Sequence, residues 1–372
     1  MLPKRVHIHD TTLRDGEQMP GVVFSRAEKL KLAEKFVEFG IDEIDIMPVV
    51  SSSESSVAAE LSQRYPEVIS ATCRIRKEDI DQVRDLGIRK ITLFAPLSDI
   101  FLNQKFGTGR RRNMRESVKC VEYASSLGLN VSFAGMDATR ADFKYLLRFI
   151  RAVEKNVEFF YLADSIGILN PRSSYEFVSK VKEASTCMIG MHVHNDFSMA
   201  TANTIEAIRA GADAFSGTFT GIGERAGNTP IEEVCVALKC LENTDLGVRY
   251  DMIAGICELV ESYSRICLQP HKPVIGRNVF SHESGIHSDA ILKSPRTFEP
   301  FEPELIGQKR RFWFGKHSGR NSLRHVLRES NVDFSEDGLR SCLDHVKSIS
   351  ENQKKSFSQD EVVQICRERF VA

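Results

Sequence analysis

Two histidines separated by one residue, His192 and His194, are the side chains best suited to chemistry in this chain. They end an apolar run that begins at Cys187, and a helical pattern follows them. In an extended strand, residues two apart project from one face, roughly 6.6–7 Å apart along the chain. Two imidazoles on one face can hold a metal ion if a third ligand comes from elsewhere. Our candidate for that third ligand is Asp15, which follows the first apolar run of the chain.

Each of these residues also has an ordinary structural interpretation. A His-x-His pair can be satisfied by backbone partners, and an aspartate at the position of Asp15 commonly caps a helix. Neither stretch is specific alone. One follows the first predicted strand and the other lies at the seventh, and this combination favours a metal site.

The composition predicts a globular protein of a reducing compartment. Hydrophobic residues make up 42% of the 372 residues and charged residues 27%, and the formal net charge is −1. This balance leaves no electrostatic footprint for nucleic acid. The nine cysteines form no CxxC motif, which argues against a disulfide framework and against a thiolate zinc site. With no apolar signal core and no apolar run of membrane length, we expect a cytoplasmic protein without a membrane partner.

Short β-rich runs alternate with amphipathic segments over the first 250 residues. The predicted strands are Arg5–His9, Glu43–Met47, Val68–Arg74, Lys90–Ala95, Asn130–Ala134, Glu158–Ala163, Cys187–His194 and Ala212–Thr218. The predicted helices are Arg26–Phe39, Ser52–Arg64, Lys77–Leu86, Met114–Leu127, Ala141–Glu154, Pro171–Glu183, Ser198–Ala210 and Pro230–Leu241. Eight alternations predict an α/β fold, a (β/α)8 barrel over residues 1–250. An open doubly wound sheet is disfavoured because the first turn is charged rather than glycine-rich.

Residues 251–372 predict a mainly helical region. Helices are expected over Met252–Cys267, Gly319–Ser330, Glu336–Ile349 and Gln359–Arg369. Between the first two lies a predicted loop region, Gln269–Gly315, which contains polar, glycine-flanked histidines. Such material is suited to closing over a site.

Four motifs together resemble the signatures of a known family. They are His9–Gln18, His192–Asp196, Gly221–Asn228 and His282–His287. Their types and order are similar to the metal-dependent barrel family that contains 2-isopropylmalate, homocitrate and citramalate synthases, with 3-hydroxy-3-methylglutaryl-CoA lyase as a more distant relative. Within that family the chain is most similar to the short bacterial homocitrate synthases.

The resemblance implies a Claisen-type condensation. Acetyl-CoA would add to the keto carbon of a 2-oxo acid, and hydrolysis of the thioester would leave a 2-hydroxy-2-alkyl dicarboxylic or tricarboxylic acid such as homocitrate. Asp15, His192 and His194 would bind a divalent ion, with Mg, Mn and Zn all compatible. Relatives dimerise through the C-terminal region, so we expect a homodimer with a C-terminal lid and dimerisation region.

The same resemblance assigns further roles at the site. Arg14 would lie where negative charge develops on oxygen, and Gln18 would reach the same substrate. Ser165 stands where relatives carry a threonine that binds the substrate carboxylate. His287 matches the catalytic lid histidine, with Glu283 as the residue that orients it.

Other positions are expected to shape the substrate pocket. We place Arg74, Ser132 and Met136 among the substrate-binding residues. Met136 stands where a glutamate is usual, and Ser132 and Ala134 lack the arginine and serine that hold the far carboxylate of 2-oxoglutarate in lysine-pathway homocitrate synthases. The acceptor is therefore 2-oxoglutarate, as in the most similar subgroup, or an unusual 2-oxo acid with another anionic group.

Three further departures concern the lid and the loops. Phe298 stands where a tyrosine assists the lid histidine, Phe101 where a histidine is frequent, and Thr220 where an asparagine is common beside the metal. These changes leave two other hypotheses open. One is a carbon–carbon lyase of the hydroxymethylglutaryl-CoA type, disfavoured because its lid cysteine has no counterpart. The other is a barrel that binds a metabolite without turnover.

Overall fold

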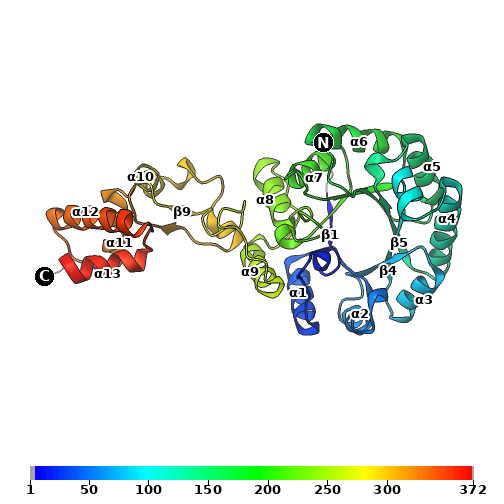
Figure 1. The fold of residues 1–372 in the computed structure, drawn as a ribbon, viewed down its shortest axis with the longest axis horizontal. Helices are drawn as coiled ribbons and strands as arrows, with labels where there is room; N and C mark the ends of the chain where they lie inside the picture. Colours follow the sequence, from blue (N-terminus) through cyan, green and yellow to red (C-terminus); the bar gives the residue numbers. More distant parts are fainter. Residues whose placement is uncertain (1–4, 371–372) are drawn as a thin grey trace. The chain divides into compact units, whose positions relative to one another are not determined.

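The computed structural model describes residues 5–370, and its first part is a closed barrel of eight parallel strands (Figure 1). Each strand pairs with the next in the chain, and β1 closes the ring against β8 through four residue pairs from His7–Ala214 to Asp10–Gly217. The strands are β1 (His7–Asp10), β2 (Glu43–Ile46), β3 (Ile69–Arg74), β4 (Lys90–Pro96), β5 (Asn130–Met136), β6 (Phe159–Asp164), β7 (Met188–Val193) and β8 (Ala214–Gly217). The predicted (β/α)8 barrel is confirmed.

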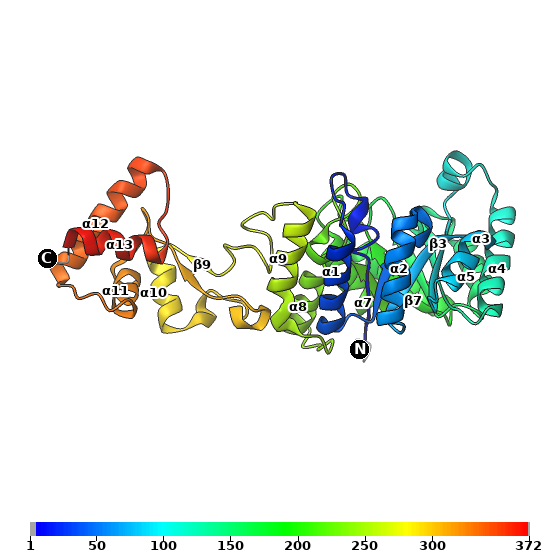
Figure 2. The same ribbon diagram turned by 90° about the horizontal axis from the view of Figure 1, so that it is seen from below.

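Helices surround the strands on the outside of the ring, and Figure 2 shows α1 and α2 side by side there. They are α1 (Arg26–Phe39), α2 (Ser52–Arg64), α3 (Lys77–Asp85), α4 (Arg110–Ser126), α5 (Phe143–Val153), α6 (Pro171–Ala184), α7 (Ala200–Arg209) and α8 (Ile231–Leu241). In α5 the buried residues Tyr145, Leu146, Phe149, Ile150 and Val153 recur at helical spacing, which gives one apolar stripe toward the strands. Burial of that stripe, rather than helix propensity alone, holds the helix against the barrel.

The helix boundaries follow the capping residues that the sequence contains. The Ser25 hydroxyl accepts a hydrogen bond from the Glu28 backbone, and Glu28 returns one, which forms a capping box at the start of α1. Gly40 ends the same helix with φ 104°, a conformation that favours glycine. At α6, Asn170 caps the helix and Pro171 occupies its first position. The observed bounds of α1 and α2 are the same as the predicted ones.

Aromatic side chains pack between the strands and the outer helices. Phe219 follows β8 and contacts Phe36 and Phe39 of α1, with ring centroids 4.9 and 5.3 Å apart. Phe133 on β5 and Phe149 on α5 form a second pair at 5.1 Å. Such pairs contribute about 0.5–1.5 kcal/mol each beyond the area that they bury. This apolar layer leaves the inside of the barrel available for polar side chains.

The chain divides into two compact units. The first comprises residues 5–249 and 255–267, and the second comprises residues 250–254 and 268 onward. Helix α9 (Ile253–Ser264) thus belongs mostly with the barrel, whereas the sequence division placed it in the C-terminal region. No helix in the described part of the chain is both long enough and apolar enough to cross a membrane.

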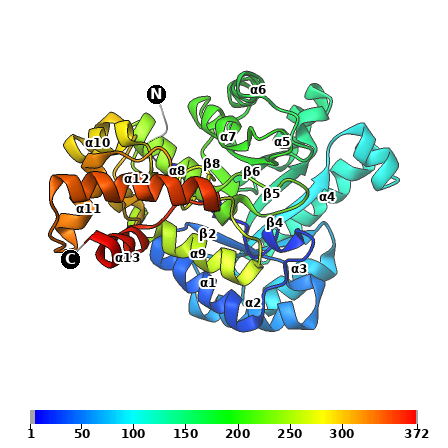
Figure 3. The same ribbon diagram turned by 60° about the vertical axis from the view of Figure 1, so that its left-hand side comes forward.

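The second unit is mainly helical, as the sequence predicted, and Figure 3 shows its helices packed together. It contains β9 (Ser281–His282), α10 (Gly285–Lys293), β10 (Arg311–Phe312), α11 (Arg320–Glu329), α12 (Glu336–Gln353) and α13 (Gln359–Phe370). The prediction of a loop region over 269–315 was wrong in part, because α10 and the two short paired strands lie there. Nine residues with a glycine at the start give too short a periodic pattern to identify α10 from sequence.

One disulfide, between Cys342 on α12 and Cys366 on α13, joins two helices of the second unit. The sequence argument against a disulfide framework is corrected to this extent, while the other seven cysteines are free. The two partners lie 24 residues apart in the chain and become neighbours because α12 and α13 pack through a shared apolar core. The spacing of the cysteines in the sequence does not predict that these two lie close together.

Candidate metal centre and active site

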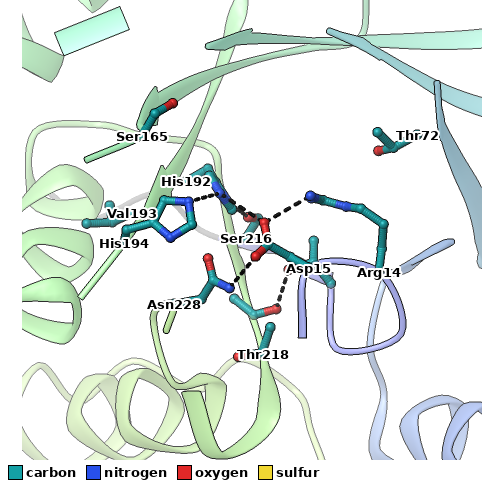
Figure 4. Close-up of polar contacts among 12 residues, drawn as sticks. Arg14, Asp15, Thr72, Ser165, His192, Val193, His194, Ser216, Thr218 and Asn228 are labelled. Carbon is teal, nitrogen blue, oxygen red and sulfur yellow. Dashed lines mark hydrogen bonds and ion pairs between the residues drawn. The ribbon is translucent and has the colours of Figure 1, made fainter. Parts of the chain in front are cut away.

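Asp15, His192 and His194 converge at the C-terminal end of the barrel strands (Figure 4). One potential ligand atom from each lies within 4.8 Å of the other two. The Nε2 atoms of the two histidines are 3.3 Å apart, and Nε2 of His192 lies 3.6 Å from Oδ2 of Asp15. The two imidazoles extend from the end of β7 and the carboxylate from the loop after β1, as the sequence predicted.

The protonation states of this group suit a cation. Burial lowers the pKa of His192 to about 3 and also lowers the pKa of His194, so both rings are neutral near pH 7 and offer lone pairs. Burial by itself would raise the pKa of Asp15, but the Arg14 guanidinium and the hydrogen bond from Asn228 lower it well below its usual range. A carboxylate and two neutral imidazoles with convergent ligand atoms fit a divalent ion of the Mn or Zn type, and Mg is also compatible.

Ser216 on β8 orients His192. Its Oγ lies 2.6 Å from Nδ1 of His192. When Nδ1 carries the ring proton and donates it to this oxygen, the lone pair of Nε2 points toward Asp15 and His194. For His194, neither ring nitrogen has a backbone partner among the described residues, which excludes the ordinary structural interpretation of the pair.

Asn228 and Arg14 hold the carboxylate of Asp15. The Asn228 amide donates to Oδ1 at 2.9 Å, and Nη1 of Arg14 donates to Oδ2 at 2.9 Å. Asp15 precedes the short helix η1 (Gly16–Gln18) but makes no capping hydrogen bond with its side chain. Because Ser25 caps α1, the interpretation of Asp15 as a helix cap is wrong.

A glycine-rich turn after β8 brings Asn228 to Asp15. Gly223 has φ 156°, and a Cβ there would lie 2.0 Å from the Asn228 amide nitrogen and 3.1 Å from Oδ1 of Asp15. Any larger residue would therefore displace Asn228 from the carboxylate. The turn is tied to the loop after β7 by Arg225, whose guanidinium binds the carboxylate of Asp196 at 2.8 Å.

Arg14 bridges two carboxylates at the centre of the site. Its Nε donates to Oδ2 of Asp45 at 2.7 Å, in addition to the bond with Asp15. Thr72 on β3 donates to the same oxygen of Asp45 at 2.8 Å. The guanidinium is thus fixed in one orientation beside the cation ligands, as is required of a group that stabilises developing negative charge.

A cavity of about 620 Å³ opens above these residues at the end of the barrel where the strands finish. Gln18, Ser165 and Met136 line it together with Arg14 and the three candidate ligands. The Oγ of Ser165 accepts a hydrogen bond from the backbone of Asp137 at 2.8 Å. These side chains therefore share one cavity with the candidate metal centre.

Two residues predicted to bind substrate do not line this cavity. Arg74 ends β3, and its guanidinium makes two hydrogen bonds to Asp79 on α3, at 2.7 and 2.8 Å. Ser132 is buried lower in β5, two residues before the cavity-lining Ala134. Both residues lie on strands that were predicted from the sequence. Arg74 is held away from the cavity by Asp79, and Ser132 lies too deep in the barrel to reach it.

His287 and Glu283 lie in the second unit. His287 is on α10 rather than in a loop, and its ring packs on Phe298 with centroids 4.2 Å apart. The carboxylate of Glu283 accepts a hydrogen bond from Ser356 at 2.6 Å, and no hydrogen bond joins it to His287 among the described residues. Their catalytic roles remain predictions.

Phe101 and Thr220, the two other positions at which the chain departs from its relatives, differ in whether they line the cavity. Phe101 lines the cavity from the segment after β4. Thr220 does not line it, and its backbone N–H is bound to Glu232 at 2.9 Å. The asparagine that lies beside Asp15 is Asn228, whose amide donates to the carboxylate at 2.9 Å.

Three residues of the site were not identified from the sequence. They are Asp45, Ser216 and Asn228. Asn228 ends a glycine-rich turn that had been recognised, so its motif was a usable signal. Asp45 and Ser216 lie inside strands, and their roles become evident only from their contacts with Arg14 and His192.

Two family models match the chain. The model described as HMGL-like matches residues 5–260, and the model described as homocitrate synthase post-HMGL domain-like matches residues 274–354. Since the first covers more than half of the chain, the chain belongs to the HMGL-like family. The resemblance predicted from the four motifs is confirmed.

Curated relatives are similar over nearly the whole chain. A putative (R)-citramalate synthase of Archaeoglobus fulgidus is 39% identical over 99% of this chain and 77% of its own length. A probable 2-isopropylmalate synthase of Methanopyrus kandleri is 39% identical, with coverage of 95% and 71%. A homocitrate synthase of Methanothermobacter thermautotrophicus is also 39% identical, with coverage of 95% and 91%.

Solved structures share the fold at lower identity. The hydroxymethylglutaryl-CoA lyase from Pseudomonas aeruginosa has a TM-score of 0.63 and 20% identity, and the match covers 70% of this chain and 93% of the lyase. At this identity the comparison supports the barrel alone.

Proposed function

We propose that this chain is an acyltransferase that condenses acetyl-CoA with a 2-oxo acid and hydrolyses the thioester, so that the acyl group becomes an alkyl group. The observation that carries the proposal is the convergence of Asp15, His192 and His194 beside a fixed Arg14 in one cavity. Relatives named citramalate, isopropylmalate and homocitrate synthase support the same reaction class.

Asp15, His192 and His194 would hold the divalent ion. When bound, the ion supplies Lewis acidity that polarises a keto group and a fixed point that orients the 2-oxo acid. The neutral imidazoles and the ionised carboxylate are ready to bind it near pH 7.

Arg14 stabilises the negative charge that develops on oxygen during the condensation. Its guanidinium is held by Asp45 and Asp15, so it does not have to reorganise as charge appears. Gln18 and Ser165, which line the same cavity, position the carboxylate of the 2-oxo acid. The Ser165 hydroxyl accepts from Asp137 N–H, which leaves its proton available to a substrate oxygen.

His287 is the proposed base that removes a methyl proton from acetyl-CoA. An imidazole suits that task near neutral pH. Phe298 packs on its ring and restricts its orientation without offering a proton. The Ser356 contact of Glu283 supports the loop that precedes α10.

The direct test measures thiol release from acetyl-CoA with a panel of 2-oxo acids, with Mg, Mn or Zn supplied. We expect release with at least one acid and a product whose mass equals that of the 2-oxo acid plus acetic acid, because thioester hydrolysis adds one water. The variant His194→Ala removes one ligand and is expected to abolish release. No release with any acid and metal would overturn the proposal.

Cleavage of a 3-hydroxyacyl-CoA is the second candidate, because the family model that matches residues 5–260 is the HMGL-like one. The match of residues 274–354 to a homocitrate synthase domain model favours condensation instead. Incubation with 3-hydroxy-3-methylglutaryl-CoA distinguishes the two, because only a lyase releases acetyl-CoA from it.

A barrel that binds without turnover is the third candidate, and it rests on Met136 and Phe298. Tight binding of a 2-oxo acid with no product would support it. The double variant Met136→Glu, Phe298→Tyr would then gain thiol release.

We further propose a cytoplasmic homodimer. Light scattering at micromolar concentration is expected to give twice the mass of 41.9 kDa, and a monomer mass would contradict this.

A further inference from the structure

The inner end of the cavity is lined by polar side chains that have no hydrogen-bond partner. Both ring nitrogens of His9, the Oγ1 of Thr92 and the phenolic oxygen of Tyr161 are buried and have no hydrogen-bond partner within the part of the chain that the structure describes, although Nε2 of His9 lies 3.6 Å from Glu43. All three residues line the cavity, and each has at most 3% of its surface exposed. Buried polar groups without partners cost free energy, so this cluster points to a polar ligand.

These residues lie below the metal centre. His9, Thr92 and Tyr161 are each the third residue of their strands, β1, β4 and β6, whereas Asp15 follows the end of β1. The ring of Tyr161 occupies space that only glycine leaves at position 190, where a Cβ would lie 2.4 Å from it. The part of an acceptor that extends away from its keto group would meet this cluster.

The charge around the cluster is not suited to an anion. Glu43 lies 3.6 Å from His9 and 3.3 Å from His7. Burial alone would raise the pKa of Glu43, but these imidazoles lower it to about 2, so it is ionised. The basic side chains that line the cavity within the described chain are Arg14, Lys105 and Arg225, which all lie beyond the ends of the strands. A second carboxylate beside His9 would lie near the ionised Glu43, with no lysine or arginine of the described lining residues at that end of the cavity.

We propose that His9, Thr92 and Tyr161 select a 2-oxo acid whose far end carries an uncharged hydrogen-bonding group, such as a hydroxyl. This inference rests on the proposed function and names the acceptor class of the same cavity. From the sequence we expected an acceptor that carries a second anionic group. The present proposal differs, because the far end of the acceptor is uncharged. A hydroxyl can donate to an unprotonated ring nitrogen of His9 and accept from Thr92 or Tyr161.

The test compares acids that differ only at the far end. 2-Oxopentanoate ends in a methyl, 4-hydroxy-2-oxobutanoate in a hydroxyl, and oxaloacetate in a carboxylate; 2-oxohexanoate, 5-hydroxy-2-oxopentanoate and 2-oxoglutarate repeat the series one carbon longer. In at least one series, we expect kcat/KM for the hydroxyl acid to exceed both others by about tenfold or more. Preference for the carboxylate or methyl acid in both series would overturn the inference.

The two proposals can fail separately. Thiol release with a carboxylate acid as the best substrate would sustain the condensation and overturn only the acceptor class. Calorimetric binding of the same acids to the metal-loaded protein decides the selectivity even where no thiol is released.

Two variants test the cluster itself. Thr92→Val and Tyr161→Phe each remove one hydroxyl with little change of volume, and each is expected to lower the hydroxyl-to-methyl selectivity by about tenfold. Ser117→Ala is the matched control, because its Oγ is also buried and unpartnered but lies on α4, outside the cavity. Unchanged selectivity in both cavity variants, with folding verified by circular dichroism, would contradict the role.

Discussion

The Nδ1 atom of His192 lies 2.6 Å from the Oγ of Ser216 on the neighbouring strand. This contact turns the Nε2 atom of His192 toward Asp15, so Ser216, which is not a candidate ligand, orients the imidazole of one.

Ser216→Ala is expected to weaken binding of Mn²⁺ or Zn²⁺ by about 10–100-fold, because the imidazole loses the hydrogen bond that sets its tautomer and orientation. Isothermal titration calorimetry measures the affinity. Ser174→Ala is the matched control, since its buried hydroxyl donates to the Asn203 carbonyl at 2.7 Å away from the site. An affinity within twofold of the parent protein would argue against the orienting role.

Arg14→Lys is expected to lower kcat by about 10²–10³-fold. A lysine cannot donate to Asp45 and Asp15 in the same fork geometry, so the positive charge loses its fixed position. Steady-state thiol release measures the effect. Arg84→Lys, which changes a surface arginine paired with Asp85, is expected to retain full activity. An equal decrease of kcat in both variants would contradict the role assigned to Arg14.

Loss of the disulfide is expected to destabilise the second unit by about 3 kcal/mol, from the loop entropy of a closure of this length. The double variant Cys342→Ser, Cys366→Ser would show this in urea unfolding followed by the fluorescence of Trp313, the one tryptophan of the chain. Alkylation of the denatured parent protein should modify seven cysteines without reductant and nine with it. Nine without reductant would contradict the disulfide.

The ion pair of Glu299 with Arg310 predicts a pH-dependent stability of the second unit. Burial alone would raise the pKa of Glu299, but the hydrogen bonds from Arg310 and His282 lower it below its usual value. A lowered folded pKa stabilises the protein above the unfolded value of about 4.3, and the contribution is lost as the pH falls through the folded pKa.

Glu299→Gln should therefore reduce the free energy of unfolding most at pH 7 and progressively less below about pH 4. Urea unfolding monitored at Trp313 measures the difference at each pH. Glu329→Gln on α11, an exposed residue that pairs with His325, serves as the control and should have little effect at any pH. A difference for Glu299→Gln that does not change with pH would contradict the assignment.

The sequence by itself determined the barrel and predicted the three candidate metal ligands that the structure brings together. Strand and helix periods repeat eight times, and caps such as Ser25 and Gly40 mark element ends through contacts within a few residues. In a (β/α)8 barrel the loops after β1 and β7 open at the same end, so the sequence predicts that Asp15, His192 and His194 lie close together, as they do.

Only the tertiary structure decided what surrounds those three candidate ligands. Ser216 acts on His192 and Asn228 on Asp15 across large separations in the chain, and no local pattern encodes such pairs. Arg74 was expected in the cavity but turns to Asp79, because a nearby carboxylate on α3 competes for its guanidinium. The unpartnered hydroxyls of Thr92 and Tyr161 also look ordinary in sequence, since burial and missing partners are properties of three-dimensional packing.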